Sequence, residues 1–320
     1  MDYQVLLLKT IRKQFSSKTS LIDEIAVILS ISYDAAHRRI AQKSKFSIEE
    51  TIQLCHHYGL SMDAVFGNAN KVLVEKTKEI QSFDDMVLYF EQSANYLKHY
   101  QDSPQATLFY SAKDIPLFYT IGGTLLSKFK LYVWLNLLID REKQESFEKF
   151  HLPRSLQEYS TQLKSVYENV AVSEIWNDTT INSTLQQICY FFESGLLTAA
   201  TATLIYEEVK LLLDLVEEKS SRNDARYHLY YNELLILNNN VLISHAEKST
   251  LFIPYTMLGY FITEDSPTTR NASDYFLHQI KNSKSLNLSG TKDRKLFFNK
   301  ARKKVDYYIQ KLDIDSNNLF

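Results

Sequence analysis

Glycine and proline are scarce in this chain, whose 320 residues include seven glycines and five prolines. Because these residues form most tight turns and interrupt helices, their scarcity favours a fold of helices with few loops. It also excludes the nucleotide-binding loops of the Walker and Rossmann types, which need closely spaced glycines. With 45% apolar residues, the chain can bury a large core, so disorder is not expected.

The chain also has few cysteines, no large excess of one charge sign and no long apolar run. The two cysteines, Cys55 and Cys189, lie in apolar contexts, so we expect both to be reduced and buried without a mutual disulfide. The net charge of −2 gives no global basic field for nucleic acid. Since the N-terminus is acidic and no segment has eighteen uninterrupted apolar residues, we expect a cytoplasmic protein that does not bind membranes.

The segment from Leu21 to Gly67 is the part of the sequence that indicates a function. Ala26 is small, so it allows a second helix to approach the first closely. A polar break follows over residues 30–32, in which Ile31 should enter the shared core and Ser32 should cap the next helix. This spacing is typical of a helix-turn-helix, which places its second helix in the major groove of DNA.

The second helix is expected over Tyr33 to Ala41. Ala36 and Ile40 are four residues apart and should face the core, which leaves the opposite side for the groove. Arg38 is then the candidate for a base or phosphate contact, whereas Asp34 either accepts from cytosine or serves as a local cap. Arg39 and the two lysines beyond it are phosphate contacts or solvated charges. The full set of predicted DNA-contacting residues is Ser32, Tyr33, Asp34, His37, Arg38, Arg39, Lys43 and Lys45.

Two further helices complete a compact module. A capping box over Ser47 to Glu50 begins the first of them, and Gly59 should end it in a left-handed conformation. Its buried stripe is expected to hold Ile48, Ile52 and Cys55. The last helix is predicted from Ser61 as its cap, Met62, Val65 and Phe66 in the core, and Gly67 at its end.

Three stretches, Ile25–Ser32, Phe46–Ile52 and Tyr58–Gly67, together resemble the lambda-repressor/Cro-like, or Xre-type, DNA-binding domain. The resemblance covers the first fifth of the chain. It implies a domain of five helices, with the first over about Tyr3 to Phe15 and the recognition helix where the pattern above places it. Two positions depart from the family, because Ile22 replaces a usual phosphate-contacting glutamine and Gln42 replaces a usual glycine.

The charge of this module is modest. Residues 1–67 contain eight Lys and Arg against seven Asp and Glu, a net charge of +1, while the remainder carries −3. DNA binding would therefore depend on a local basic cluster, doubled by dimerisation, and non-specific affinity should be modest. The cluster comprises Lys9, Arg12, Lys13, Arg38, Arg39, Lys43 and Lys45.

The remaining four fifths of the chain show a different pattern. Residues 68–70 form the expected hinge, and residues 71–320 the second domain. Between Tyr227 and Ile262, the apolar runs 234–237 and 241–243 flank an asparagine-rich turn, which predicts a small antiparallel sheet. Helices are expected over Val72–Tyr100 with a break near Ser82, and over Leu125–Ile139, Leu156–Val170, Thr180–Ser194, Thr198–Lys219, Ala272–Lys281 and Lys292–Leu312. The predicted fold class is thus mainly α, with a five-helix helix-turn-helix domain at 1–67 and a larger helical domain that has a small antiparallel β segment near residues 227–262.

Residues Ala112–Phe118, Ala-Lys-Asp-Ile-Pro-Leu-Phe, and the terminal Phe297–Asn299 segment resemble an uncharacterised group of bacterial regulators. The resemblance implies that the C-terminal part is an effector or assembly domain, and it names no ligand.

Catalytic and metal-binding patterns are weak. Consecutive helical residues point about 100° apart, so Cys55, His56 and His57 cannot converge on one ion. His228 and His245 are expected on adjacent strands, where such pairs are usually ordinary surface residues. The glycines at 122–123, with Lys128, are more simply a helix start than a phosphate site, and the basic final helix is more simply a solvated face. We expect no enzymatic activity, no metal and no cofactor.

The sequence predicts a bacterial DNA-binding transcriptional regulator that binds double-stranded DNA as a homodimer. Its C-terminal domain would hold the dimer together and sense a small-molecule or peptide effector, since aromatic walls suit an apolar or planar ligand. A phage-type or antitoxin-type repressor and a protein-interaction adaptor are the alternatives. The aromatic candidates for such walls are Phe109, Tyr110, Phe118, Tyr119, Trp134, Tyr255 and Tyr260.

Overall fold

The computed structural model describes residues 2–14, 20–66, 71–101, 103, 105–139, 145–222, 224–246, 248–287 and 290–318. Residue contacts divide the chain into two compact units, Met1–Leu73 and Val74–Phe320. The expected end of the first helix at Phe15, the expected closing residue Gly67 and the expected hinge at 68–70 lie outside the described residues.

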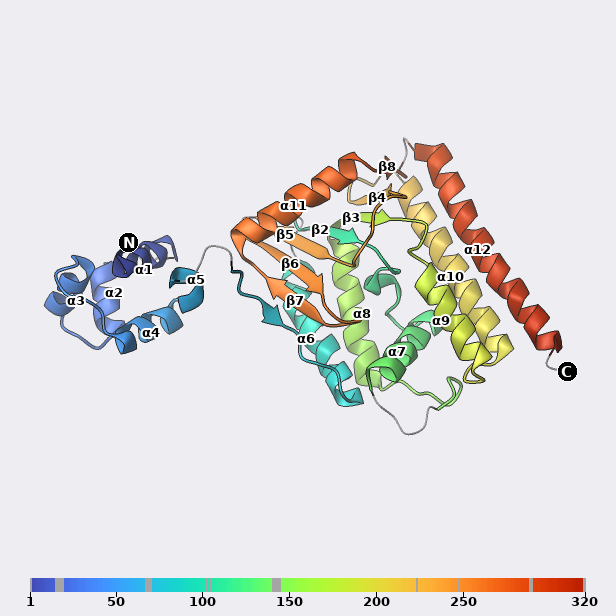
Figure 1. Ribbon diagram of the computed structural model, residues 1–320, viewed down its shortest axis with the longest axis horizontal. Coiled ribbons are helices and arrows are strands. Elements are labelled where there is room, and N and C mark those ends of the chain that lie inside the picture. The colour runs from blue at the N-terminus through green and yellow to red at the C-terminus, as the bar shows by residue number, and fades with distance from the viewer. Residues whose placement is uncertain are drawn as a thin grey trace. The chain divides into compact units, whose positions relative to one another are not determined.

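The N-terminal unit is a bundle of short helices around its own core (Figure 1). Its helices are α1 (Tyr3–Gln14), α2 (Leu21–Ile28), α3 (Tyr33–Ile40), α4 (Ile48–His57) and α5 (Met62–Phe66). These helices lie over the ranges that the sequence predicts. Ile25, Ala36 and Leu54 have no exposed surface, so the core forms where α2, α3 and α4 meet.

The predicted apolar stripe of α4 is confirmed at Cys55 and wrong at Ile48 and Ile52. Leu54 and Cys55 are buried, but Ile48 and Ile52 are exposed. Glu50, the third residue of α4, forms an ion pair with Arg39 of α3. This pair fixes which side of α4 faces the core, and Ile48 lies on the other side.

The C-terminal unit is built on one mixed sheet, which has eight strands in the described part of the chain. The strands are β1 (Glu75–Lys76), β2 (Thr107–Ser111), β3 (Ala171–Trp176), β4 (Tyr227–Tyr231), β5 (Val241–His245), β6 (Lys248–Pro254), β7 (Tyr260–Thr263) and β8 (Lys284–Ser285). Their order is β1-β7-β6-β5-β2-β3-β4-β8. The strands β2, β3 and β4 are parallel and joined by helical crossovers, while the other pairings are antiparallel.

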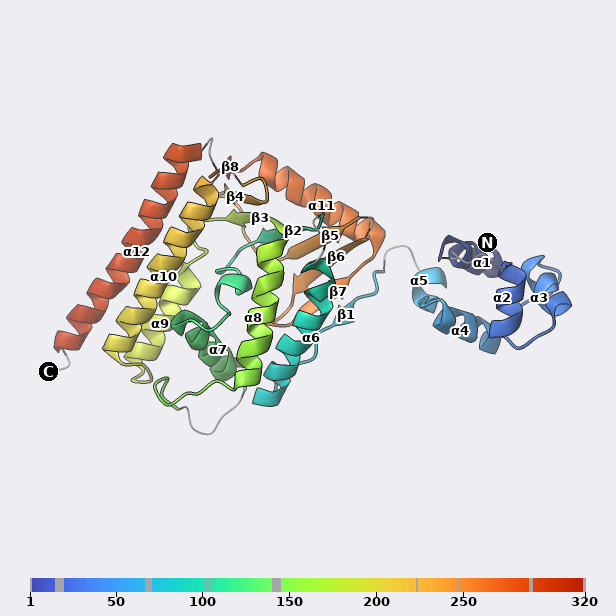
Figure 2. The same cartoon turned by 180° about the vertical axis from the view of Figure 1, so that it is seen from behind.

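Helices cover both faces of this sheet. They are α6 (Phe83–Gln101), the short 3₁₀ helix η1 (Leu117–Tyr119), α7 (Leu125–Leu138), α8 (Arg154–Asn169), α9 (Asn182–Glu193), α10 (Ala199–Ser221), α11 (Ser266–Lys281) and α12 (Thr291–Asn318). Side chains alternate along each strand, so Leu108 and Tyr110 enter the large core with α6 and α8, whereas Phe109 stacks on Phe276 of α11 at 5.6 Å. Figures 1 and 2 show α10 and α12 side by side from both directions.

The expectation of a mainly helical fold with a small antiparallel segment near 227–262 is therefore wrong. Four strands do lie in that range, but they do not form a separate antiparallel sheet. Strand β4 pairs in parallel with β3, and both β3 and β2 lie between β4 and β5 in one larger sheet. Strands β2 and β3 are five and six residues long and are largely buried on both faces, so they lack the polar alternation that identifies a strand in sequence.

Two local expectations in this unit also fail, and one is confirmed. Residues 72–82 are not helical, because β1 lies there and α6 begins only at Phe83. Residues 234–237 are not a strand, since Leu234 and Ile236 are 92% and 95% exposed. The turn that follows is confirmed at Asn239, whose φ is 61°.

In the described residues, no helix is both long and apolar enough to cross a membrane.

Candidate nucleic-acid interface

Both ends of α3 are fixed by local hydrogen bonds. The Ser32 hydroxyl caps its start by accepting from the Ala35 N–H at 3.3 Å, as the sequence predicts. At its end, the N–H groups of Gln42 and Lys43 donate to the carbonyls of Arg39 and Arg38, at 3.1 and 2.8 Å. These paired bonds close the helix as a Schellman motif.

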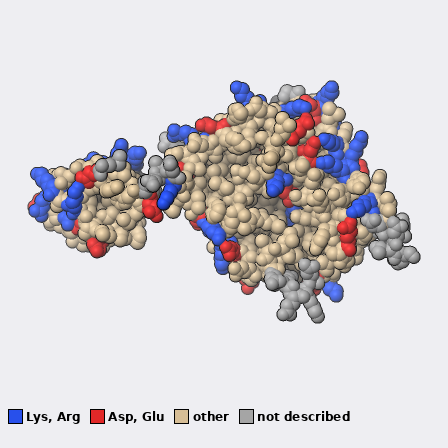
Figure 3. All heavy atoms as spheres, in the orientation of Figure 1, with Lys and Arg blue, Asp and Glu red and all other residues tan. Residues whose placement is uncertain are grey.

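The outer side of α3 presents one exposed face. Ala36 is fully buried, so Tyr33, Asp34, His37 and Arg38 project on the opposite side of the helix, and all four are exposed. Within the part of the chain that the structure describes, none of these four side chains has a hydrogen-bond or ion-pair partner. The space-filling view shows Lys and Arg side chains gathered over the end of the unit that α3 forms (Figure 3). The face can therefore donate hydrogen bonds to an external acceptor.

Arg39 differs from its neighbour Arg38. Its guanidinium binds Glu50 of α4 through two bonds of 2.6 and 2.9 Å, and a third bond of 3.2 Å reaches the Ala35 carbonyl. Such a bidentate pair is stronger than a single charged contact. Burial raises the pKa of Glu50, but Arg39 and the Ser47 N–H more than offset this and hold the pKa below its ordinary value. The predicted phosphate contact is thus occupied inside the unit, where it joins α3 to α4.

Lys45 also has an internal partner, because its ammonium lies 2.5 Å from the Asp2 carboxylate. The hydrogen bond from Lys45 lowers the pKa of Asp2, and the Gln4 N–H adds to the effect. Both side chains remain exposed to solvent, so the pair contributes little to stability. Lys43, in the same loop, is exposed, and its side chain has no hydrogen-bond or ion-pair partner among the described residues.

Gln4 holds the loop after α3 in place, a structural role that no sequence pattern indicates. Its amide nitrogen donates to the carbonyls of Arg39 and Ser44 at 2.7 and 2.9 Å, and its oxygen accepts from the Phe46 N–H at 3.1 Å. This buried side chain on α1 thereby holds the loop that follows α3. Nothing in the spacing of residues 3–8 marks it, because its partners lie 35 to 42 positions away.

Three helices of this unit end in the same way. Ser30, Gln42 and Gly59 have φ values of 53°, 60° and 60°, the left-handed region. The residue after each donates to a carbonyl one turn back, at 3.0, 2.8 and 2.8 Å. The sequence predicts the Gly59 end. Gln42 stands where the family that the sequence resembles usually has glycine, and it adopts the conformation that glycine would favour.

The other candidate sites of the sequence are not assembled. His228 and His245 lie on β4 and β5, which are separated in the sheet by β2 and β3, so the expectation of adjacent strands is wrong. The described residues hold no group of three or more His, Cys, Asp or Glu side chains arranged for a metal ion, and Cys55 is buried while His56 and His57 are exposed.

The helix start after the two glycines is a cap rather than an open anion site. Thr124 accepts from the Ser127 N–H at 3.1 Å, as an N-cap does. The carboxylate of Glu208 on α10 accepts from the N–H groups of Leu125 and Leu126 at 3.1 and 2.6 Å. An internal anion therefore already satisfies these donors.

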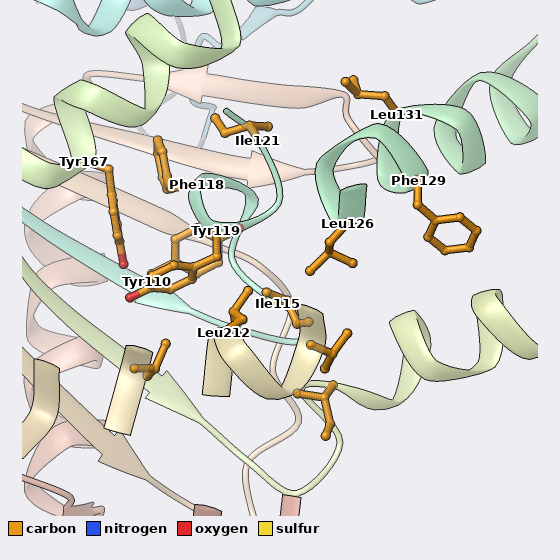
Figure 4. Packing of buried hydrophobic residues seen from close by; sticks show 14 of the residues in the cluster. Tyr110, Ile115, Phe118, Tyr119, Ile121, Leu126, Phe129, Leu131, Tyr167 and Leu212 are labelled. Atoms are coloured by element: carbon orange, nitrogen blue, oxygen red, sulfur yellow. The ribbon is translucent and has the colours of Figure 1, made fainter. Parts of the chain in front are cut away.

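The Ala112–Phe118 segment has a structural role. Asp114 accepts from Lys130 at 2.9 Å and from Thr184 at 3.1 Å, which joins the end of β2 to α7 and α9. Lys130 is fully buried, so this pair compensates a charge inside the core. Phe118 stacks on Tyr167 of α8 at 4.3 Å, as the close view shows (Figure 4).

A scan against models of known protein families finds no match to this chain, and searches of curated proteins and of solved structures find none either.

Proposed function

We propose that the protein is a sequence-specific DNA-binding transcriptional regulator, with α3 as the helix that enters the major groove. The observation that carries the proposal is the contrast between Arg38 and Arg39. The Arg39 side chain is held within the unit by Glu50, whereas the Arg38 side chain is exposed beside His37 and has no hydrogen-bond or ion-pair partner in the described chain. An arginine in that position can donate two hydrogen bonds to the edge of guanine.

One such unit covers a half-site, so we further propose that the regulator acts as a homodimer on a two-fold symmetric operator. As a bacterial regulator of transcription it would act in the cytoplasm. The C-terminal unit would supply the dimer contact and the sensor.

The test begins with selection of bound duplexes from a random library by the full-length protein, followed by affinity measurements on the selected site. Arg38→Ala should weaken binding by roughly 1–3 kcal/mol and relax the preference at one base pair, because one bidentate contact is lost. Arg154→Ala is the matched control: it removes the same charge from an exposed position on α8, and it should leave affinity unchanged. Failure to enrich any duplex, or wild-type affinity and preference in Arg38→Ala, would contradict the proposal.

A further inference from the structure

A cavity of about 380 Å³ lies in the C-terminal unit between α6 and one face of the sheet. Its volume falls within the range of about 300–1,000 Å³ that is typical of small-molecule sites. Strands β2, β5, β6 and β7 form its floor and α6 its roof. The apolar side chains that line it include Leu97, Leu108, Val241, Ile243, Phe252 and Ile262.

Four tyrosines of the described chain line the same cavity. Three come from different elements, namely Tyr89 of α6, Tyr110 of β2 and Tyr260 of β7, and the fourth, Tyr96 of α6, donates its hydroxyl to Glu264 at 3.1 Å. Burial raises the pKa of Tyr260 to about 12, although a hydrogen bond with Tyr110 opposes the rise. Burial also raises the pKa of Tyr89 and of Tyr110 above the ordinary value. All three hydroxyls are therefore neutral at physiological pH and can each donate or accept a hydrogen bond.

Charge is confined to the edge of the cavity. Of the residues known to line it, the charged ones are Glu75, Lys76 and Lys78, which are exposed. Lys76 pairs with Glu79 at 2.6 Å and Lys78 with Asp85 at 2.7 Å. Since the other described residues that line the cavity are uncharged, an ionised ligand would lose its hydration there without a partner, whereas a neutral ligand would not incur this cost.

One wall of the cavity is the segment with which the C-terminal unit begins. Strand β1 follows Val74 directly and joins the sheet at the edge of β7. Beside the ladder pairs of Glu75 with Ile262 and Lys76 with Phe261, Tyr260 adds two bonds to this segment: its carbonyl accepts from the Thr77 N–H at 3.0 Å, and its own N–H donates to the Thr77 hydroxyl at 2.9 Å. Tyr260 therefore lines the cavity and also binds, through its backbone, the segment that leads to the N-terminal unit.

We propose that this cavity is the binding site for a neutral, largely apolar small molecule with a hydrogen-bonding group for the tyrosine hydroxyls, and that its occupancy is coupled through β1 to DNA binding. The second part rests on the proposed function. A ligand that stabilises one arrangement of Tyr260 and β1 changes DNA affinity only if the two arrangements bind DNA differently, and DNA then changes ligand affinity by the same factor.

The first experiment tests the site alone, with the full-length protein and without DNA. The probe is N-phenyl-1-naphthylamine, a neutral aromatic amine whose fluorescence rises in apolar surroundings. We expect saturable binding to the wild type and at least a tenfold loss in Ser93→Phe, which places a ring in the cavity from α6. Asn95→Phe is the control, because Asn95 lies on α6 outside the lining and is exposed. Equal binding in both variants, or none in the wild type, would overturn the site.

Tyr260→Phe provides a second test in case Ser93→Phe does not fold, since it keeps the shape of the cavity and removes only one hydroxyl. It should bind the probe about fivefold more weakly, as expected for one lost hydrogen bond. Unchanged probe affinity in Tyr260→Phe would remove the polar part of the proposal.

The second experiment measures affinity for the selected DNA site with and without saturating probe. We expect at least a twofold change in the wild type and none in Ser93→Phe. If the probe binds but DNA affinity does not change, the coupling is refuted while the site stands. If no DNA site exists, the proposed function fails, and the probe titration still decides the cavity on its own.

Discussion

Glu174 is a fully buried carboxyl group in the middle of β3. It accepts from the Tyr119 hydroxyl at 2.7 Å, from the Trp176 indole at 2.6 Å and from the Tyr227 hydroxyl at 3.4 Å. Burial raises the pKa of Glu174 to about 7, although the bonds from Tyr119 and Trp176 oppose the rise. This side chain therefore changes its ionisation near neutral pH inside the core.

The stability of the C-terminal unit should consequently depend on the protonation of Glu174. Its folded pKa lies above the ordinary value, so the folded state binds a proton more tightly than the unfolded state. The resulting stabilisation is complete below the ordinary pKa of Glu and is lost as the pH rises through about 7. Its magnitude is about 3 kcal/mol at 1.4 kcal/mol per pKa unit.

Glu174→Gln should remove this slope. Urea unfolding between pH 5 and 8, followed by tryptophan fluorescence, is the measurement, because both tryptophans, Trp134 and Trp176, lie in the C-terminal unit. Stability should fall with rising pH in the wild type and stay nearly level in the variant. Parallel curves for the two proteins would show that Glu174 does not titrate in this range.

At the scale of single elements, the end of α3 carries a conformational cost. Gln42 has a φ of 60°, where the side chain of a non-glycine residue is unfavourable. Gln42→Gly should stabilise the N-terminal unit by about 1 kcal/mol. Hydrogen exchange of the α3 and α4 amides in the full-length protein measures this, as slower exchange in the variant. Gln53→Gly, within α4, is the matched control and should accelerate exchange.

The elements that the sequence predicts well are those defined by neighbours along the chain. The Ser32 cap and the capping box of Ser47 depend on residues three positions away, and both form. Strands β2 and β3 depend on partners 64 residues apart, such as Tyr110 opposite Glu174, and their buried faces hide the strand pattern.

The same distinction applies to the candidate site. The exposed face of α3 follows from helical spacing, because Ala36 fixes which side is buried. The sequence cannot separate Arg38 from Arg39, since the difference lies in a partner eleven residues away on another helix. The role of Gln4 cannot be predicted from the sequence for the same reason, because its partners lie 35 to 42 positions away.

At the scale of the whole molecule, a dimeric regulator needs a self-complementary surface. Helix α10 presents Leu204, Leu211 and Leu215 on one side of the helix, and Leu211 is 64% exposed. Leu211→Glu should raise the dimer dissociation constant at least tenfold, measured by light scattering across a concentration series. Leu277→Glu, at an exposed position of α11, is the control and should have no effect. A monomeric wild type at micromolar concentration, free and on DNA, would refute the dimer.

The ion pair of Arg39 and Glu50 limits which substitutions relatives of this protein can accept in α3 and α4. Glu50 binds two nitrogens of Arg39 and completes the capping box of α4, so its loss would disturb both helices at once. We expect these two positions to vary together among relatives. The exposed side chains of His37 and Arg38 form no hydrogen bond or ion pair with a described residue, so substitutions there should leave the core unchanged. If the protein binds DNA as proposed, substitutions that change the preferred operator can therefore occur without substitutions that change the fold, and a duplicated copy could acquire a new operator while it kept its structure.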